Sequence, residues 1–170
     1  MSQTNVDQVA AAIAQFAQIQ AGDGSTPITL EQKRLVLETW KQVAVNGDAA
    51  AALFYRRLFE TDPTTRELFR ATDMSAQRRK LIMTIGFAIV SLDHLDLLKL
   101  TMGELGRRHA GYGVKDKHYD TVGFALLWTL ERGLGKNWNA DVSAAWAEVY
   151  GTLAGVMRRA QQHALAEAMA

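Results

Sequence analysis

His109 is the residue of this chain best placed to do chemistry. It ends a run of apolar residues at alternating spacings of three and four: Leu95, Leu98, Met102 and Leu105. On a helix these side chains form one apolar stripe, with the imidazole at its C-terminal end. A histidine on such a face can hold a metal or a cofactor inside a core. The same spacing also suits a hydrogen-bonded core histidine, so the pattern alone leaves both interpretations open.

Two polar side chains place hydrogen-bonding groups on other apolar helical faces. Tyr55 shares a face with Leu58, and Gln77 heads a stripe that continues with Leu81 and Ile85. Buried polar groups need partners. The phenol and the amide could bond to each other, or they could line a cavity and donate to a small polar ligand. Spacing does not choose between these alternatives.

Composition restricts the class of protein. A chain of 170 residues with 48% hydrophobic residues can build one domain with a substantial core. It contains no cysteine, which excludes disulfides, thiolate catalysis and zinc–thiolate sites. The net charge of +1 gives no reason to expect nucleic-acid binding. No run reaches the ~20 apolar residues of a membrane span, and the N-terminus lacks the basic region of a signal peptide, so we expect a cytoplasmic protein.

The elements that must position these side chains are helices. Apolar residues recur at helical spacing without sustained alternation, which predicts an all-α fold. Thr29 and Gln32 form a capping box that opens a helix to about residue 45. Further helices are expected over about 48–60, 63–69, 75–92, 95–109, 116–134 and from 140 onward. Their predicted N-terminal caps are Asp48, Asp62, Asp116 and Asn139.

The first 27 residues form a separate segment. Val6, Val9, Ile13 and Phe16 lie at helical spacing, and a Gly- and Ser-containing linker follows over residues 21–27. We expect a short amphipathic helix here. It is either a loosely docked arm or a contact for dimerisation or for another partner.

Three stretches of the chain resemble globins, in particular single-domain bacterial haemoglobins and the globin domains of flavohaemoglobins, with neuroglobin a more distant relative. They are LFYRRLFETDPTTRELF, GELGRRHAGYGVKDKHYDTVGFALLWTLERGLG and AAWAEVYGTLAGVM. The resemblance implies a globin fold, a three-over-three helical sandwich, over residues 28–163. Residues 1–27 would then be an N-terminal helical arm and linker, and residues 164–170 a C-terminal helical tail.

The resemblance also implies a cofactor, haem b, and a role for each site residue. His109 would be the iron ligand, and Tyr55, Gln77 and Leu81 would contact the bound gas. Lys80 would pair with a haem propionate, although a solvated position on a helix face is the alternative for this lysine. The full set of implied haem contacts is Phe69, Lys80, Leu81, Leu105, His109, Tyr112, Val114 and Val122.

By the same resemblance, the protein would bind dioxygen, carbon monoxide and nitric oxide reversibly at a five-coordinate iron. Two donors, a phenol and an amide, would slow the release of a ligand that gains negative charge, which favours retention over delivery. Nitric oxide dioxygenation would require an external reductase, because the chain has no visible flavin or nicotinamide site.

One position departs from the flavohaemoglobin pattern. That pattern links the proximal histidine through a tyrosine to a glutamate, and here Tyr119 is present but Gln161 occupies the glutamate position. An amide cannot supply the same negative charge to the histidine. The alternatives are a haem-based gas or redox sensor that acts through a partner of the N-terminal arm, and a haem-free helical scaffold. A homodimer is a further expectation.

Overall fold

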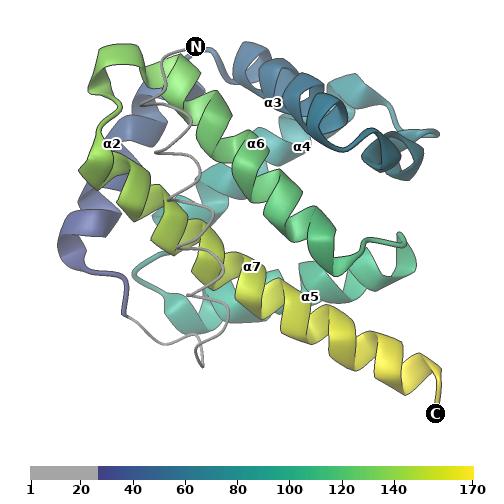
Figure 1. Cartoon of the computed structure of the whole chain (residues 1–170). Coiled ribbons are helices and arrows are strands. Elements are labelled where there is room, and N and C mark those ends of the chain that lie inside the picture. The colour runs from purple at the N-terminus through teal and green to yellow at the C-terminus, as the bar shows by residue number, and fades with distance from the viewer. Residues whose placement is uncertain (1–26) are drawn as a thin grey trace.

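Helices make up most of the chain in the computed structural model, which describes residues 27–170 (Figure 1). Within this range no strand is present, which confirms the all-α prediction. The amphipathic helix expected before residue 21 lies outside the described residues. The elements are α2 (Leu30–Ala44), α3 (Gly47–Thr61), the 3₁₀ helix η1 (Pro63–Phe69), α4 (Met74–Val90), α5 (Leu95–Gly111), α6 (Asp116–Leu134), the 3₁₀ turn η2 (Gly135–Asn137) and α7 (Ala140–Ala168).

Side-chain caps fix where several helices begin. Thr29 and Gln32 form the expected capping box at α2, with nitrogen–oxygen distances of 3.1 and 2.8 Å. Asn139 accepts a hydrogen bond from the N–H of Val142 at the start of α7. Asp62 likewise accepts from the N–H of Thr64 at the start of η1.

Two predicted caps are wrong. Asp48 does not cap α3, because that helix already begins at Gly47 and the flanking residue Asn46 makes no side-chain capping bond. Asp116 is the first residue of α6 and not its cap. The N–H of Lys115 instead donates to Nδ1 of His118 at 3.0 Å, so a side chain in the first turn bonds back to the residue before the helix.

The hydrophobic core lies where α2, α3, α6 and α7 meet. Trp146 of α7 is only 2% exposed, and its ring lies 6.2 Å from the ring of Trp40 in α2. The indole N–H of Trp146 donates to the hydroxyl of Thr39 at 2.9 Å, so the polar end of this large side chain is satisfied inside the core. This scaffold holds the two helices that carry Gln77 and His109.

Those two helices, α4 and α5, are anchored on different neighbours. The contacts of α4 are mainly with α2 and α3, those of α5 mainly with α7, and α4 and α5 hardly contact one another. At the α5–α7 crossing, a Cβ on Gly106 would lie only 2.2 Å from the carbonyl oxygen of Met157. The two backbones therefore meet directly, three residues before His109.

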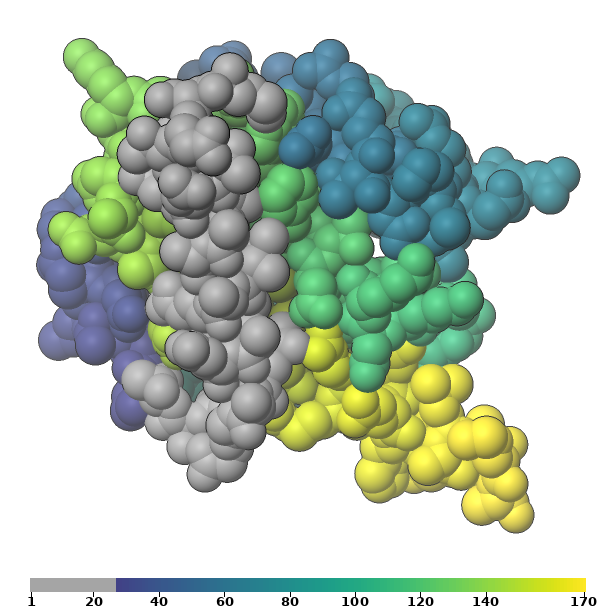
Figure 2. Space-filling view, in the orientation of Figure 1, coloured from purple at the N-terminus to yellow at the C-terminus, as the bar shows by residue number. Residues whose placement is uncertain are grey.

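The last turns of α7 project from the body of the molecule, as the ribbon and space-filling views show (Figures 1 and 2). Nearly all side chains from residue 162 onward are exposed. Among residues 27–170, no helix is both long enough and apolar enough to span a membrane.

Candidate functional site

Tyr55 of α3 and Gln77 of α4 are in contact. The amide nitrogen Nε2 of Gln77 donates to the Tyr55 hydroxyl at 3.1 Å. Tyr55 is 5% exposed, and its burial raises the pKa of the phenol, so the hydroxyl keeps its proton at neutral pH. The bond to Gln77 uses the oxygen of the hydroxyl and leaves its hydrogen without a partner among the described residues. The two side chains thus bond to each other and still retain a donor for a ligand.

An aromatic wall surrounds the Tyr55 ring. Phe69, the last residue of η1, meets it edge to face at 5.3 Å, and Phe59 lies 6.0 Å from it. Leu81, one turn after Gln77 on α4, is half-buried and packs against the core. The structure therefore gathers four predicted side chains, Tyr55, Phe69, Gln77 and Leu81, around the corner between α3, η1 and α4.

His109 lies near the end of α5 and has one ring nitrogen anchored. Its Nδ1 is 2.7 Å from the carbonyl oxygen of Leu105, one turn earlier. A carbonyl can only accept, so Nδ1 carries the hydrogen and Nε2 presents a lone pair. Burial lowers the pKa of the imidazole, which keeps it neutral near pH 7, while the bond to Leu105 opposes that shift. Nε2 has no hydrogen-bond partner in the described part of the chain.

This donor arrangement fits a haem iron. A metal-ligating histidine usually donates its second ring nitrogen to a carbonyl or carboxylate, which fixes the tautomer that binds the metal. His109 has that tautomer and a half-buried ring. Within residues 27–170 no cluster of three or more His, Cys, Asp or Glu could hold an ion by itself. A single histidine with this tautomer can be the one protein ligand of a metal held within a cofactor.

Behind His109, Tyr119 and Gln161 form a buried pair. The Tyr119 hydroxyl donates to Oε1 of Gln161 at 2.7 Å, and Nε2 of Gln161 donates to the carbonyl of Val114 at 2.5 Å. The Tyr119 ring lies nearly parallel to the His109 ring, with 6.1 Å between their centroids. Nδ1 of His109 is engaged with Leu105 and the Tyr119 hydroxyl donates to Gln161, and no hydrogen bond joins the two rings.

The remaining predicted haem contacts differ in burial. Leu105, Val114 and Val122 are half-buried, as side chains that line a cofactor pocket would be. Tyr112 is 63% exposed, with its ring 6.1 Å from that of His109. Lys80 is exposed and makes no ion pair among residues 27–170, which leaves its ammonium group available to a propionate.

The other three histidines of the chain lie elsewhere. His94 precedes α5, His118 caps α6, and His163 pairs with Glu167 near the C-terminus. Within the described residues none of these three is hydrogen-bonded to or stacked on Tyr55 or Gln77. The polar groups at the Tyr55–Gln77 corner are therefore a phenol and an amide, and a neutral amide is a poor iron ligand.

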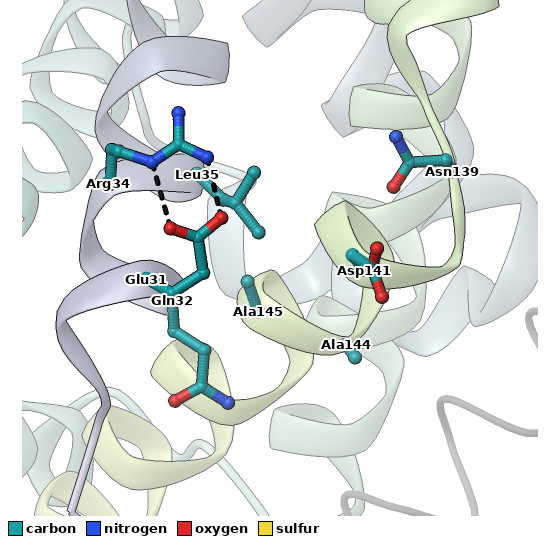
Figure 3. A pocket seen from close by; sticks show the side chains of 8 residues that line it. All are labelled: Glu31, Gln32, Arg34, Leu35, Asn139, Asp141, Ala144 and Ala145. Carbon is teal, nitrogen blue, oxygen red and sulfur yellow. Dashed lines mark hydrogen bonds and ion pairs between the residues drawn. The ribbon is translucent and has the colours of Figure 1, made fainter.

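A separate groove of about 540 Å³ lies between α2 and the start of α7 (Figure 3). Its lining includes Glu31, Arg34 and Asp141, and none of the predicted site residues. Arg34 is neutralised there by ion pairs with Glu31 and Glu38. Such exposed pairs are common on helix surfaces. Asp141 has no ion pair in the described part of the chain, but it is exposed, and none of the polar side chains that line the groove is buried.

Sequence reasoning missed three features of the site. Phe59 belongs to the aromatic wall, the Leu105 carbonyl anchors His109, and the Val114 carbonyl binds Gln161. The first two could have been predicted from the sequence, because Phe59 lies one helical turn after Tyr55 and Leu105 one turn before His109. The third joins residues 47 positions apart and leaves no local pattern.

Comparison with known proteins identifies the family. The globin family model matches residues 52–157, more than half of the chain. The chain belongs to the globin family. The neuroglobin of Tetraodon nigroviridis is 28% identical over 145 residues, which cover 78% of this chain and 91% of that protein. Family membership supports haem binding and the binding of diatomic gases such as dioxygen.

Solved structures agree on the fold. The hexacoordinated haem protein of an anhydrobiotic tardigrade superposes with a TM-score of 0.75 at 17% identity, covering 83% of this globin and 99% of that chain. A bacterial globin from Campylobacter jejuni gives a TM-score of 0.71 at 23% identity, with 81% and 99% covered. These likenesses confirm the globin fold expected from the sequence.

Proposed function

We propose that this globin binds haem b through Nε2 of His109 and retains a diatomic gas, dioxygen foremost, beside Tyr55 and Gln77. The observation that carries the proposal is the anchored tautomer of His109, whose free lone pair is already oriented by the 2.7 Å bond to Leu105. The haem iron, when bound, supplies the centre at which the gas binds and leaves. The half-buried apolar side chains Phe69, Leu81, Leu105 and Val122 would hold the ring and exclude water.

Tyr55 and Gln77 set how long the gas stays. The phenol hydrogen of Tyr55 is free to donate, and Gln77 holds the phenol oxygen in place at 3.1 Å. A neutral hydrogen bond is worth about 0.5–1.5 kcal/mol, and more when it reaches a ligand that gains negative charge in a dry pocket. Dioxygen accepts such a bond better than carbon monoxide does, so the pair favours dioxygen.

The iron would be five-coordinate before the gas binds. The structurally similar tardigrade protein is described as hexacoordinated. Here none of the three other histidines is bonded to Gln77 or Tyr55 in the described part of the chain, and a neutral amide is a poor ligand. A ferrous absorbance spectrum of the high-spin, five-coordinate type would support this proposal.

The test is haem binding by His109→Ala, with His163→Ala as the matched control because that ring is 77% exposed. We expect the wild type and His163→Ala to purify with a Soret band that shifts with dithionite and carbon monoxide. His109→Ala should lose most of its haem. If His109→Ala retains haem with an unchanged spectrum, another residue is the ligand and the proposal is wrong. A mainly low-spin ferrous spectrum near neutral pH would contradict five-coordination.

A further inference from the structure

Gln161 is a buried amide on the proximal side of the site, the side that carries His109. It connects α7, α6 and the turn after α5. It lies on α7 and is 3% exposed. Its Oε1 accepts from the Tyr119 hydroxyl on α6, and its Nε2 donates to the carbonyl of Val114 in the turn after α5. An amide buried this deeply must satisfy both of its ends, and Gln161 does so.

The chemistry of its two partners requires a group that donates at one end and accepts at the other. The Val114 carbonyl can only accept, and Tyr119 donates its hydroxyl hydrogen. A carboxylate at this position could accept from Tyr119, but it would place a negative charge against the Val114 carbonyl in a buried site. A hydrocarbon side chain would leave both partners without a bond.

The turn held by Gln161 is tied to His109. The N–H of Val114 donates to the carbonyl of His109 at 3.3 Å, and the same carbonyl accepts from the N–H of Tyr112. Gln161 therefore holds the residue that closes the end of α5. It also fixes Tyr119, whose ring centroid lies 6.1 Å from that of His109 and 5.2 Å from the guanidinium carbon of Arg158.

We propose that Gln161 is a positioning residue for His109, and that it acts as a neutral bridge between Tyr119 and Val114, with no role as a source of charge. The role of His109 as haem ligand is taken from the proposed function. The lack of a hydrogen bond between Tyr119 and His109 supports a positioning role over a role as a source of charge. Without that bond, no chain of hydrogen bonds links position 161 to the imidazole. Gln161 orients the ring through the backbone of the turn and through the face of Tyr119.

The decisive variant is Gln161→Glu, because its behaviour should depend on pH. A protonated glutamic acid has one O–H donor for Val114 and one carbonyl acceptor for Tyr119, so it reproduces the amide pattern. Ionised glutamate does not. At pH 8 we expect Gln161→Glu to release haem roughly tenfold faster than the wild type, the effect of one buried bond lost. At pH 5 the two rates should agree within about twofold.

Two control variants distinguish loss of the Gln161 bridge from general destabilisation of the fold. Gln162→Glu makes the same change at the exposed neighbouring residue, where it replaces the 3.4 Å bond from Nε2 of Gln162 to Asp116 with a contact between two solvent-exposed carboxylates. Because exposed charges interact weakly, its pH-dependent ratio should be much smaller than that of Gln161→Glu. Gln161→Met keeps the length without either bond, and should release haem faster at both pH values. Each rate is divided by that of the wild type at the same pH, which removes the titration of other groups. The charged neighbours Asp116, Asp120 and Arg158 are common to all variants, and Tyr119 has a pKa of about 12 and keeps its proton throughout.

A spectroscopic readout tests positioning directly. The iron–histidine stretching frequency of ferrous Gln161→Glu should match the wild type at pH 5, and should broaden or shift at pH 8 as the ring loses a fixed orientation. If Gln161→Glu equals the wild type at both pH values, or Gln161→Met retains haem as well as the wild type, the bridge has no positioning role. If the wild type itself binds no haem through His109, the proposed function fails. The pH-dependent thermal stability of the haem-free variants then still tests the bridge.

Discussion

The two sides of the predicted haem site are built in different ways. On the distal side, Tyr55 and Gln77 meet through one bond between side chains, and α4 approaches its neighbours through side chains. A Cβ on Gly86 of α4, for example, would lie 3.4 Å from the Trp40 indole. On the proximal side, His109 and Gln161 both bond to backbone carbonyls, and the backbones of α5 and α7 meet at Gly106.

The difference separates two requirements of a gas-binding site. Side-chain contacts can rearrange when a ligand arrives, whereas bonds to the backbone and a direct backbone crossing hold a ligand nitrogen in one place. The proximal side thus supplies an iron-binding nitrogen in a fixed position, and the distal side sets the affinity for the gas. Substitutions should therefore damage folding and haem retention on the proximal side, and gas kinetics on the distal side.

The largest effect on folding should come from Gly106→Ala. The new Cβ would lie 2.2 Å from the Met157 carbonyl oxygen, so α5 and α7 must move apart. We expect a loss of at least about 2 kcal/mol in the free energy of unfolding, and weaker haem binding, measured by denaturant titration and haem transfer. Gly103→Ala is the matched control, because its Cβ would lie 3.9 Å from that of Ala160. That variant should be more stable by about 0.5–1 kcal/mol, the usual preference for alanine within a helix. Equal effects at the two positions would show that the crossing is not rigid.

Tyr55→Phe should change kinetics more than stability. It removes the phenol donor without opening a large cavity, so dioxygen should dissociate roughly tenfold faster, since about 1.4 kcal/mol corresponds to a factor of ten. Carbon monoxide, measured by the same flash or stopped-flow method, should change less. Gln77→Leu should have a smaller effect on dioxygen. An unchanged dioxygen off-rate in Tyr55→Phe would mean that Tyr55 is only a core residue.

The smallest effect should come from Asp62, which joins the distal corner to α6. Its carboxylate accepts from Thr64 and lies 2.9 Å from Nζ of Lys117, and these hydrogen bonds lower its pKa to about 2. The folded pKa is below the ordinary value of 3.8, so this stabilisation is present above about pH 4 and disappears as the pH falls towards 2. Asp62→Asn should lower Tm slightly at pH 7 and leave it nearly unchanged at pH 2.

Thermal melts across this pH range check the Asp62 prediction. Asp141→Asn is a suitable control, since Asp141 is exposed and has no ion pair in the described part of the chain. The same acid sensitivity in Asp62→Asn and in the wild type would show that the pair with Lys117 contributes nothing measurable.

Features that depend on local sequence were predictable, and those that depend on the backbone of a distant segment were not. Thr29 and Asn139 cap their helices as expected, because a cap involves residues three positions apart. The contact of Tyr55 with Gln77 was one of two alternatives, since both side chains lie on apolar helical faces. The Gln161–Val114 bond was not predictable, because a sequence identifies polar side chains but not the carbonyls that lack a partner.

The α5–α7 crossing also limits how this globin could transmit a signal. A sensor must turn ligand binding into a displacement that a partner can detect. Movement of α5 along α7 would require the backbones at Gly106 and Met157 to separate. The distal helix α4 has no comparable obstruction, and its outer side exposes Met83, Phe87 and Val90. A displacement transmitted from this site through α4 would therefore meet less steric resistance than one transmitted by sliding α5 along α7.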